Sequence, residues 1–165
     1  MAMRQFAAQA ATALRVRCAP ASIHAGFPVS VARAFSTVVD SLKYATSHEW
    51  VKIDGETAVI GITDHAQSEL GDIVFAEIKG AVGDSITAND SFASVESVKA
   101  VSDVMAPVSG EILEINDTLK NEPGAINESP FEKGWFAKVK MSNPSEVNQL
   151  LDSKAYEAHV EANAH

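Results

Sequence analysis

The sequence predicts a mainly β fold, a small barrel or sandwich of short strands, with one short helix after the first hairpin and helices packed on the barrel at the C-terminal end. Short runs rich in Val and Ile recur between turn residues from residue 49 to residue 115, a spacing typical of such folds. Beyond residue 143 the apolar residues recur three and four positions apart, which is the helical period. The chain has 165 residues, 46% hydrophobic and 21% charged, as expected of one modest globular domain.

The first β unit is a hairpin within residues 49–62. Asp54-Gly55 divides it, and this dipeptide suits the positive φ angles of a tight turn. Thr63 follows as an N-cap for a helix that runs through Leu70, and Gly71 stands where a left-handed helix end is easiest. We therefore expect two strands and then a helix of about two turns.

Further strands are expected in the rest of the chain, with glycine and proline at their ends. Residues 80–84 read as a turn rather than a phosphate-binding loop, because no long helix follows them. Asn143-Pro144 places a capping residue before a proline at the first helical position, and a second helix is expected over 152–160. The expected strands are 73–78, 92–97, 101–105, 110–115 and 135–141.

Charge divides the chain into a cationic head and an acidic body. The first 35 residues contain four arginines and no acid, whereas residues 36–165 contain nine lysines and all 22 acidic residues, a net charge of −13. An acid-free head rich in Ala, Ser and Arg is typical of a mitochondrial transit peptide, and its arginines interrupt the apolar run that a secretory signal needs. A disordered basic tail is the alternative.

Arg33-Ala34-Phe35, directly before Ser36, resembles the pattern after which matrix proteases cut. We therefore expect residues 1–35 to be a transit peptide and residues 36–165 to be the mature domain. The mitochondrial matrix is the expected location.

Several classes of function are disfavoured by what the body lacks. Cys18, the only cysteine, falls in the expected transit peptide, so the body has no thiol for a disulfide, a nucleophile or a zinc site. Its histidines have no metal-binding spacing, and there is no nucleophile elbow, Walker motif or dinucleotide fingerprint. Negative charge without arginine disfavours nucleic acid as a partner, and no run approaches the roughly 20 apolar residues of a membrane span. An autonomous enzyme is therefore the weakest interpretation.

Residues 96–103, Glu-Ser-Val-Lys-Ala-Val-Ser-Asp, lie between two strand-like runs. If those runs pair, Lys99 lies at the tip of a hairpin, where its ammonium group points into solvent and a modifying enzyme reaches it. Taken alone, the pattern also fits an ordinary solvated turn lysine.

The pattern around Lys99 resembles the biotinyl and lipoyl carrier domains, in which a hairpin lysine receives the cofactor, and it implies their barrel-sandwich hybrid fold. The matching segments are 82–84, 95–100 and 106–110. Glu96, three residues before the lysine, and Gly83, sixteen before it, match positions that lipoyl attachment enzymes read in that family. Biotin domains usually have methionine on both sides of the lysine, whereas Val98 and Ala100 flank it here. The resemblance therefore implies lipoate on Lys99 rather than biotin.

Four further segments resemble the H protein of glycine cleavage and are lacking in the lipoyl domains of 2-oxoacid dehydrogenase acyltransferases: 47–51, 61–67, 70–75 and 134–140. The resemblance implies a non-catalytic carrier that shuttles the aminomethyl group of glycine from the P protein (glycine decarboxylase) to the T protein (aminomethyltransferase). It also implies delivery of reducing equivalents to the L protein (dihydrolipoyl dehydrogenase). Lipoyl attachment enzymes are further implied partners, and we expect a monomer.

The acidic body fits such a carrier, because the loaded arm ends in an amine that is cationic at neutral pH. By the same resemblance, Glu49, Ser47 and Asp103 match polar positions near the arm and are expected to line a cleft for it; each also fits an ordinary exposed polar residue. The acidity either steers basic partners or only keeps the protein soluble. The alternatives left open are a biotin carrier, an unmodified binding module with the same fold, and a lipoyl domain of a multidomain acyltransferase.

Overall fold

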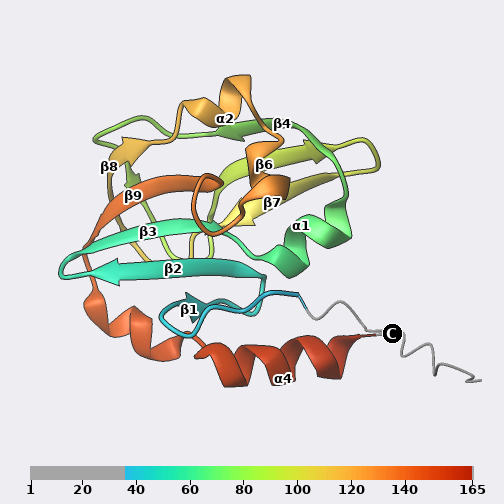
Figure 1. Cartoon of the computed structure of the whole chain (residues 1–165). Coiled ribbons are helices and arrows are strands. Elements are labelled where there is room, and N and C mark those ends of the chain that lie inside the picture. The colour runs from blue at the N-terminus through green and yellow to red at the C-terminus, as the bar shows by residue number, and fades with distance from the viewer. Residues whose placement is uncertain (1–35, 165) are drawn as a thin grey trace, which may run out of the picture. The chain divides into compact units, whose positions relative to one another are not determined.

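Two antiparallel sheets form the body of the domain in the computed structural model, which describes residues 36–164 (Figure 1). The expected transit peptide, residues 1–35, lies outside the described residues. The six-stranded sheet has the order β1 (Lys43–Tyr44), β2 (Glu49–Asp54), β3 (Thr57–Ile62), β9 (Trp135–Met141), β8 (Gly110–Ile115) and β5 (Ser85–Ile86). The three-stranded sheet has the order β4 (Ile73–Ile78), β6 (Ser91–Ser97) and β7 (Val101–Met105).

Short helices connect and cover the strands. They are α1 (Asp64–Leu70), α2 (Thr118–Asn121), α3 (Ala125–Glu128), the 3-10 helix η1 (Pro144–Gln149) and α4 (Ser153–Asn163). Figure 1 shows α1 close to the free end of the β6–β7 hairpin and α4 running beneath β1. Within residues 36–164, none of these helices is long and apolar enough to cross a membrane.

One hydrophobic core fills the space that the two sheets enclose. Phe92 of β6 and Phe136 of β9 bring the sheets together edge to face, with ring centroids 6.3 Å apart. A second, smaller cluster joins β1 and β2 to α4 through Leu42, Tyr44, Trp50 and Tyr156. In it the Tyr44 and Tyr156 rings are stacked at 4.5 Å, which fixes α4 on the six-stranded sheet.

The local signals at the start of the domain are confirmed. The β2–β3 hairpin turns at Gly55, whose φ is 61°. Thr63 Oγ1 accepts a hydrogen bond from the Ala66 amide, as an N-cap does, and Gly71 ends α1 with a φ of 79°. The mainly β expectation is also confirmed, with the strands 73–78, 101–105, 110–115 and 135–141 at their expected bounds and the strand expected at 92–97 one residue longer.

The structure differs from the expectations in segments whose secondary structure depends on contacts between residues distant in sequence. The segment after Asn143-Pro144 is a 3-10 helix, and Asn143 makes no capping hydrogen bond there. The C-terminal helix extends to Asn163, three residues beyond the expected end. The two-residue strands β1 and β5 and the single-turn helices α2 and α3 were not expected. Each is too short to show a period in the sequence, and β1 forms because its Tyr44 pairs with β2 and bonds to Leu151 through both backbone groups.

Candidate functional site

The β6–β7 turn presents Lys99 at the tip of a hairpin, as expected. The buried Ser97 holds the turn: its hydroxyl oxygen accepts from the Lys99 and Ala100 amides at 3.2 and 3.0 Å. The Ser97 amide donates to the Ala100 carbonyl at 2.8 Å. The backbone of the lysine is therefore fixed, while its exposed side chain extends from the tip.

The tip rests against the corner where α1 passes into β4. The Lys99 ammonium group donates to the Glu69 carbonyl at 3.1 Å, and the Val98 amide donates to the Asp72 carbonyl at 3.1 Å. The lysine stem passes close to Gly71, where a Cβ would stand 3.0 Å from Lys99 Cε. Any larger residue at position 71 would force the methylene chain of Lys99 to move from its present position.

Asn127 of α3 braces this corner, a role that the sequence did not reveal. Its side-chain amide donates to the Gly71 carbonyl at 2.8 Å and to Gln67 Oε1 at 2.9 Å, and its side-chain oxygen accepts from the buried Ile73 amide at 2.9 Å. Asn127 lies 28 residues beyond the lysine in the chain, so local pattern carries no signal for this contact.

A cavity of about 550 Å³ opens beside the corner, within the usual size range for small ligands. We call it the arm pocket. The β1–β2 loop contributes Ser47 and His48, α1 contributes Ala66, Glu69 and Leu70, and β7 contributes Ser102. Because Glu69 both lines the arm pocket and accepts from Lys99, the lysine amine already stands at the rim of the pocket.

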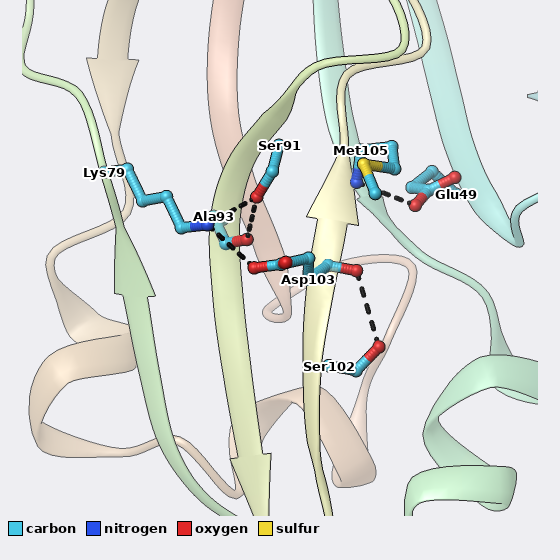
Figure 2. A network of polar contacts seen from close by, with 7 residues as sticks. All are labelled: Glu49, Lys79, Ser91, Ala93, Ser102, Asp103 and Met105. Atoms are coloured by element: carbon cyan, nitrogen blue, oxygen red, sulfur yellow. Dashed lines mark hydrogen bonds and ion pairs between the residues drawn. The ribbon is translucent and has the colours of Figure 1, made fainter.

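Glu49 lies behind one wall of the arm pocket, with only 2% of its surface exposed. One carboxylate oxygen accepts from the Ser47 hydroxyl. The other accepts from the Met105 amide at 3.0 Å (Figure 2). Burial raises the pKa of Glu49, and the two hydrogen bonds oppose that shift. Because Ser47 donates its hydrogen to Glu49, its oxygen remains an acceptor on the pocket side.

Asp103, the third expected cleft residue, points elsewhere. Figure 2 shows its carboxylate directed at Lys79, with which it forms a 2.7 Å ion pair on the exposed face of the three-stranded sheet. The hydrogen bond from Lys79 lowers the pKa of Asp103. Successive strand residues face opposite sides, so it is the neighbouring Ser102 that faces the arm pocket. The structure thus brings Ser47 and Glu49 together and leaves Asp103 apart from them.

The two expected recognition residues also lie apart. Glu96 is exposed on the outer face of β6, paired with Phe75 of β4 and Val101 of β7, both of which are exposed. Gly83 lies beyond the opposite end of β4, in the turn before β5, with a φ of 95° and its amide bonded to the Ile112 carbonyl. Glu96 is therefore close to Lys99 and Gly83 is not.

Aromatic side chains pack beside the arm pocket, where α4 meets the β1–β2 loop and α1. The Tyr156 hydroxyl lies 2.8 Å from Thr63 Oγ1 and 2.9 Å from His48 Nδ1, and burial raises the pKa of Tyr156 to about 12. His65 stands 4.7 Å and His159 5.7 Å from the His48 ring. Burial, helped by these two rings, lowers the pKa of His48. Among the residues that the structure describes, no group of three or more His, Cys, Asp or Glu side chains is arranged to hold a metal ion.

Comparison with known proteins decides the family. The family model described as "Glycine cleavage H-protein" matches residues 42–163. The chain belongs to this family. It is 57% identical over 156 residues to the mitochondrial glycine cleavage system H protein of Mesembryanthemum crystallinum, covering 94% of each chain. It is 52% identical over 161 residues to that of Oryza sativa subsp. indica, covering 98% of this chain and 97% of the relative.

A solved glycine cleavage H protein, from Mycobacterium marinum, has the same fold. Its crystal structure is similar with a TM-score of 0.67 and 32% sequence identity, covering 76% of this chain and 98% of that one. The expectation of a barrel-sandwich carrier fold is thereby confirmed. In this chain the hairpin lysine, the corner braced by Asn127 and the arm pocket lie side by side.

Proposed function

We propose that Lys99 carries a covalently attached lipoyl group and that this arm serves the carrier role of the chain in the glycine cleavage system. Family membership makes the chain a carrier subunit rather than a catalyst. The single observation that supports Lys99 is its position: an exposed amine at the tip of a rigid hairpin, at the rim of a pocket large enough to receive an arm. The biotin-carrier alternative is not favoured.

The residues of the arm pocket fit a lipoyl arm. Ala66 and Leu70 offer apolar surface to an aliphatic chain, and Ser47 and Ser102 offer oxygen acceptors. When bound, the lipoyl group supplies a disulfide that accepts the aminomethyl group of glycine and is later restored by oxidation. Ser47, oriented by the buried Glu49, would accept a hydrogen bond from a cationic amine and shield it from water.

The role of Glu49 has a direct test. In Glu49→Gln the oriented carboxylate is lost, and we expect the aminomethyl-loaded arm to lose its load faster in buffer, followed by intact mass. An unchanged lifetime of the loaded arm would show that Glu49 has no role in retaining it. Asp103→Asn is the matched comparison, since the structure directs that carboxylate at Lys79 and away from the arm pocket.

We propose the P, T and L proteins and the lipoyl attachment enzymes as partners. Glu96, exposed beside the tip, is the residue that we propose an attachment enzyme reads; a contact with Gly83 would require that enzyme to extend along β4. The net charge of −13 after residue 35 would steer basic partner surfaces. Rates of exchange with the T protein that do not change between low and high salt would assign the acidity to solubility alone.

Like its named relatives, the chain acts in mitochondria, and the expected compartment is the matrix. We propose that residues 1–35 are the transit peptide and that the mature carrier is a monomer. Peptide mass spectrometry of the protein isolated from mitochondria tests the main proposal. A lipoyl mass on the Lys99 peptide with an N-terminus near Ser36 supports both proposals, whereas an unmodified Lys99 would overturn the carrier site and a biotin mass would assign carboxylase chemistry.

A further inference from the structure

The arm pocket has a wall that neither the hairpin nor α1 supplies. Asn163 and Ala164, at the end of α4, line it together with Ser102 of β7 and Glu69 of α1. These residues come from three separate elements and meet only through the folded structure. The C-terminal turn of α4 therefore borders the same cavity as the elements that hold Lys99.

The body of α4 is held firmly on the same framework as the arm pocket. Tyr156, in the first turn of the helix, is buried, stacks on Tyr44 and has its hydroxyl within hydrogen-bond distance of Thr63 and His48. Thr63 is the N-cap of α1, and His48 lines the arm pocket. Any movement of α4 relative to the pocket would break these buried contacts.

The last turn of α4 is tied to the β1–β2 loop by a short chain of hydrogen bonds. His159 Nε2 lies 3.1 Å from the Thr46 carbonyl, which can only accept, so Nε2 carries the hydrogen. Asn163 Nδ2 then donates to the His159 carbonyl at 2.7 Å and lies 3.4 Å from Nδ1 of the same residue's ring. Asn163 thus secures the helix end, and His159 secures it to the residue next to Ser47.

We propose that the C-terminal turn of α4, secured by Asn163, is a positioning element that closes the arm pocket and retains the loaded arm. The inference rests on the proposed lipoyl site at Lys99. Its consequence is chemical, because the aminomethyl thioether is unstable in water. One water breaks its carbon–sulfur bond, releasing formaldehyde and an ammonium ion and leaving the thiol. A wall at this position excludes that water.

The experiment compares lifetimes of the loaded arm. Full-length protein lipoylated on Lys99 is loaded with glycine and the P protein, separated from both, and followed by intact mass. In Asn163→Ala the bond that secures the helix end is lost, and we expect the load to disappear roughly fivefold faster, as expected from one lost hydrogen bond. A chain that stops after Ala162 removes the wall itself and should lose its load at least as fast.

Glu161→Ala is the matched control, because Glu161 is exposed in the same helical turn and outside the arm pocket; its lifetime should equal that of the parent protein. Amide hydrogen exchange gives an independent measurement, since loading should protect the C-terminal turn of α4 in the parent and not in Asn163→Ala. Equal lifetimes in all four proteins, or no protection of α4 on loading, would overturn the inference while leaving the lipoyl site intact. Absence of a lipoyl group from Lys99 would overturn both.

Discussion

Replacing Gly71 by alanine should destabilise the domain through the backbone rather than through the lysine beside it. Gly71 adopts φ 79° and ψ −153°, a region that costs other residues about 1–3 kcal/mol. Relaxation is opposed because its amide donates to the Gln67 carbonyl at 3.0 Å and its carbonyl accepts from Asn127 at 2.8 Å. The new Cβ would lie 3.0 Å from Lys99 Cε, but that stem is exposed and can rotate away. We expect a loss of about 2 kcal/mol.

Urea unfolding at neutral pH measures this loss, as a lower midpoint at unchanged slope. The melting temperature should fall by roughly 6–10 °C for a domain of this size. Two glycines with open space at their Cβ positions serve as controls. Gly55→Ala shares a positive φ of 61° and should lose about 1 kcal/mol, whereas Gly124→Ala, at φ −60°, should change stability by no more than about 0.5 kcal/mol.

A double-mutant cycle with Lys99→Ala separates the two causes. If the cost comes from the backbone, removing the lysine stem does not rescue Gly71→Ala, and the coupling energy stays below about 0.5 kcal/mol. A coupling above about 1 kcal/mol would show that the stem is held rigidly against α1, and the reasoning would fail. A Gly71→Ala protein as stable as the parent would contradict the corner geometry itself.

Three further changes test the framework around the site. Asn127→Ala removes the partner of the buried Ile73 amide and should lower the free energy of unfolding by about 2–3 kcal/mol in the same urea assay; the exposed Asn121→Ala should not change it. Because the pKa of His48 is lowered from 6.5 by folding, the unfolded chain binds a proton first, so stability should fall as pH drops below 6.5. In His48→Asn, which tolerates the φ of 76° at this position, urea midpoints between pH 7 and pH 5 should lose that dependence. Tyr156→Phe leaves Thr63 Oγ1 and His48 Nδ1 without their shared partner and should lower the free energy of unfolding by about 1–3 kcal/mol in the same urea assay at neutral pH.

The features predicted correctly from the sequence are those that a few neighbouring residues determine. Asp54-Gly55 requires a tight turn, Thr63 caps the helix that follows it, and alternation of apolar residues defines β6 and β7 around Lys99. Each feature depends on backbone angles or hydrogen bonds within a few residues. The hairpin and its exposed lysine could therefore be placed before any tertiary contact was known.

The arm pocket could not be predicted in the same way, because its walls come from the β1–β2 loop, α1, β7 and the end of α4. Strand parity shows the difficulty at Asp103. The family resemblance implied that Asp103 lines the cleft, but with Val104 buried, Asp103 faces the opposite side and Ser102 faces the pocket. The side of the sheet that Asp103 faces could have been predicted from the sequence once Val104 was taken as a core residue. The contribution of Asn163 to the arm pocket could not have been predicted in this way, because Asn163 is 61 residues beyond Ser102.

A swinging carrier arm needs a root that does not move, since the position of the root sets which surfaces the arm can reach. Ser97 fixes the turn, the Asp72 carbonyl holds the Val98 amide, and Asn127 braces the corner on which the lysine rests. None of these three contacts involves the side chain of Lys99. Modification of its amine would therefore leave all three intact. The corner also carries Glu69, a wall of the arm pocket, and the root and the pocket therefore belong to one rigid unit. Asn127→Ala should consequently shorten the lifetime of the loaded arm as well as lower the free energy of unfolding, although Asn127 does not line the arm pocket.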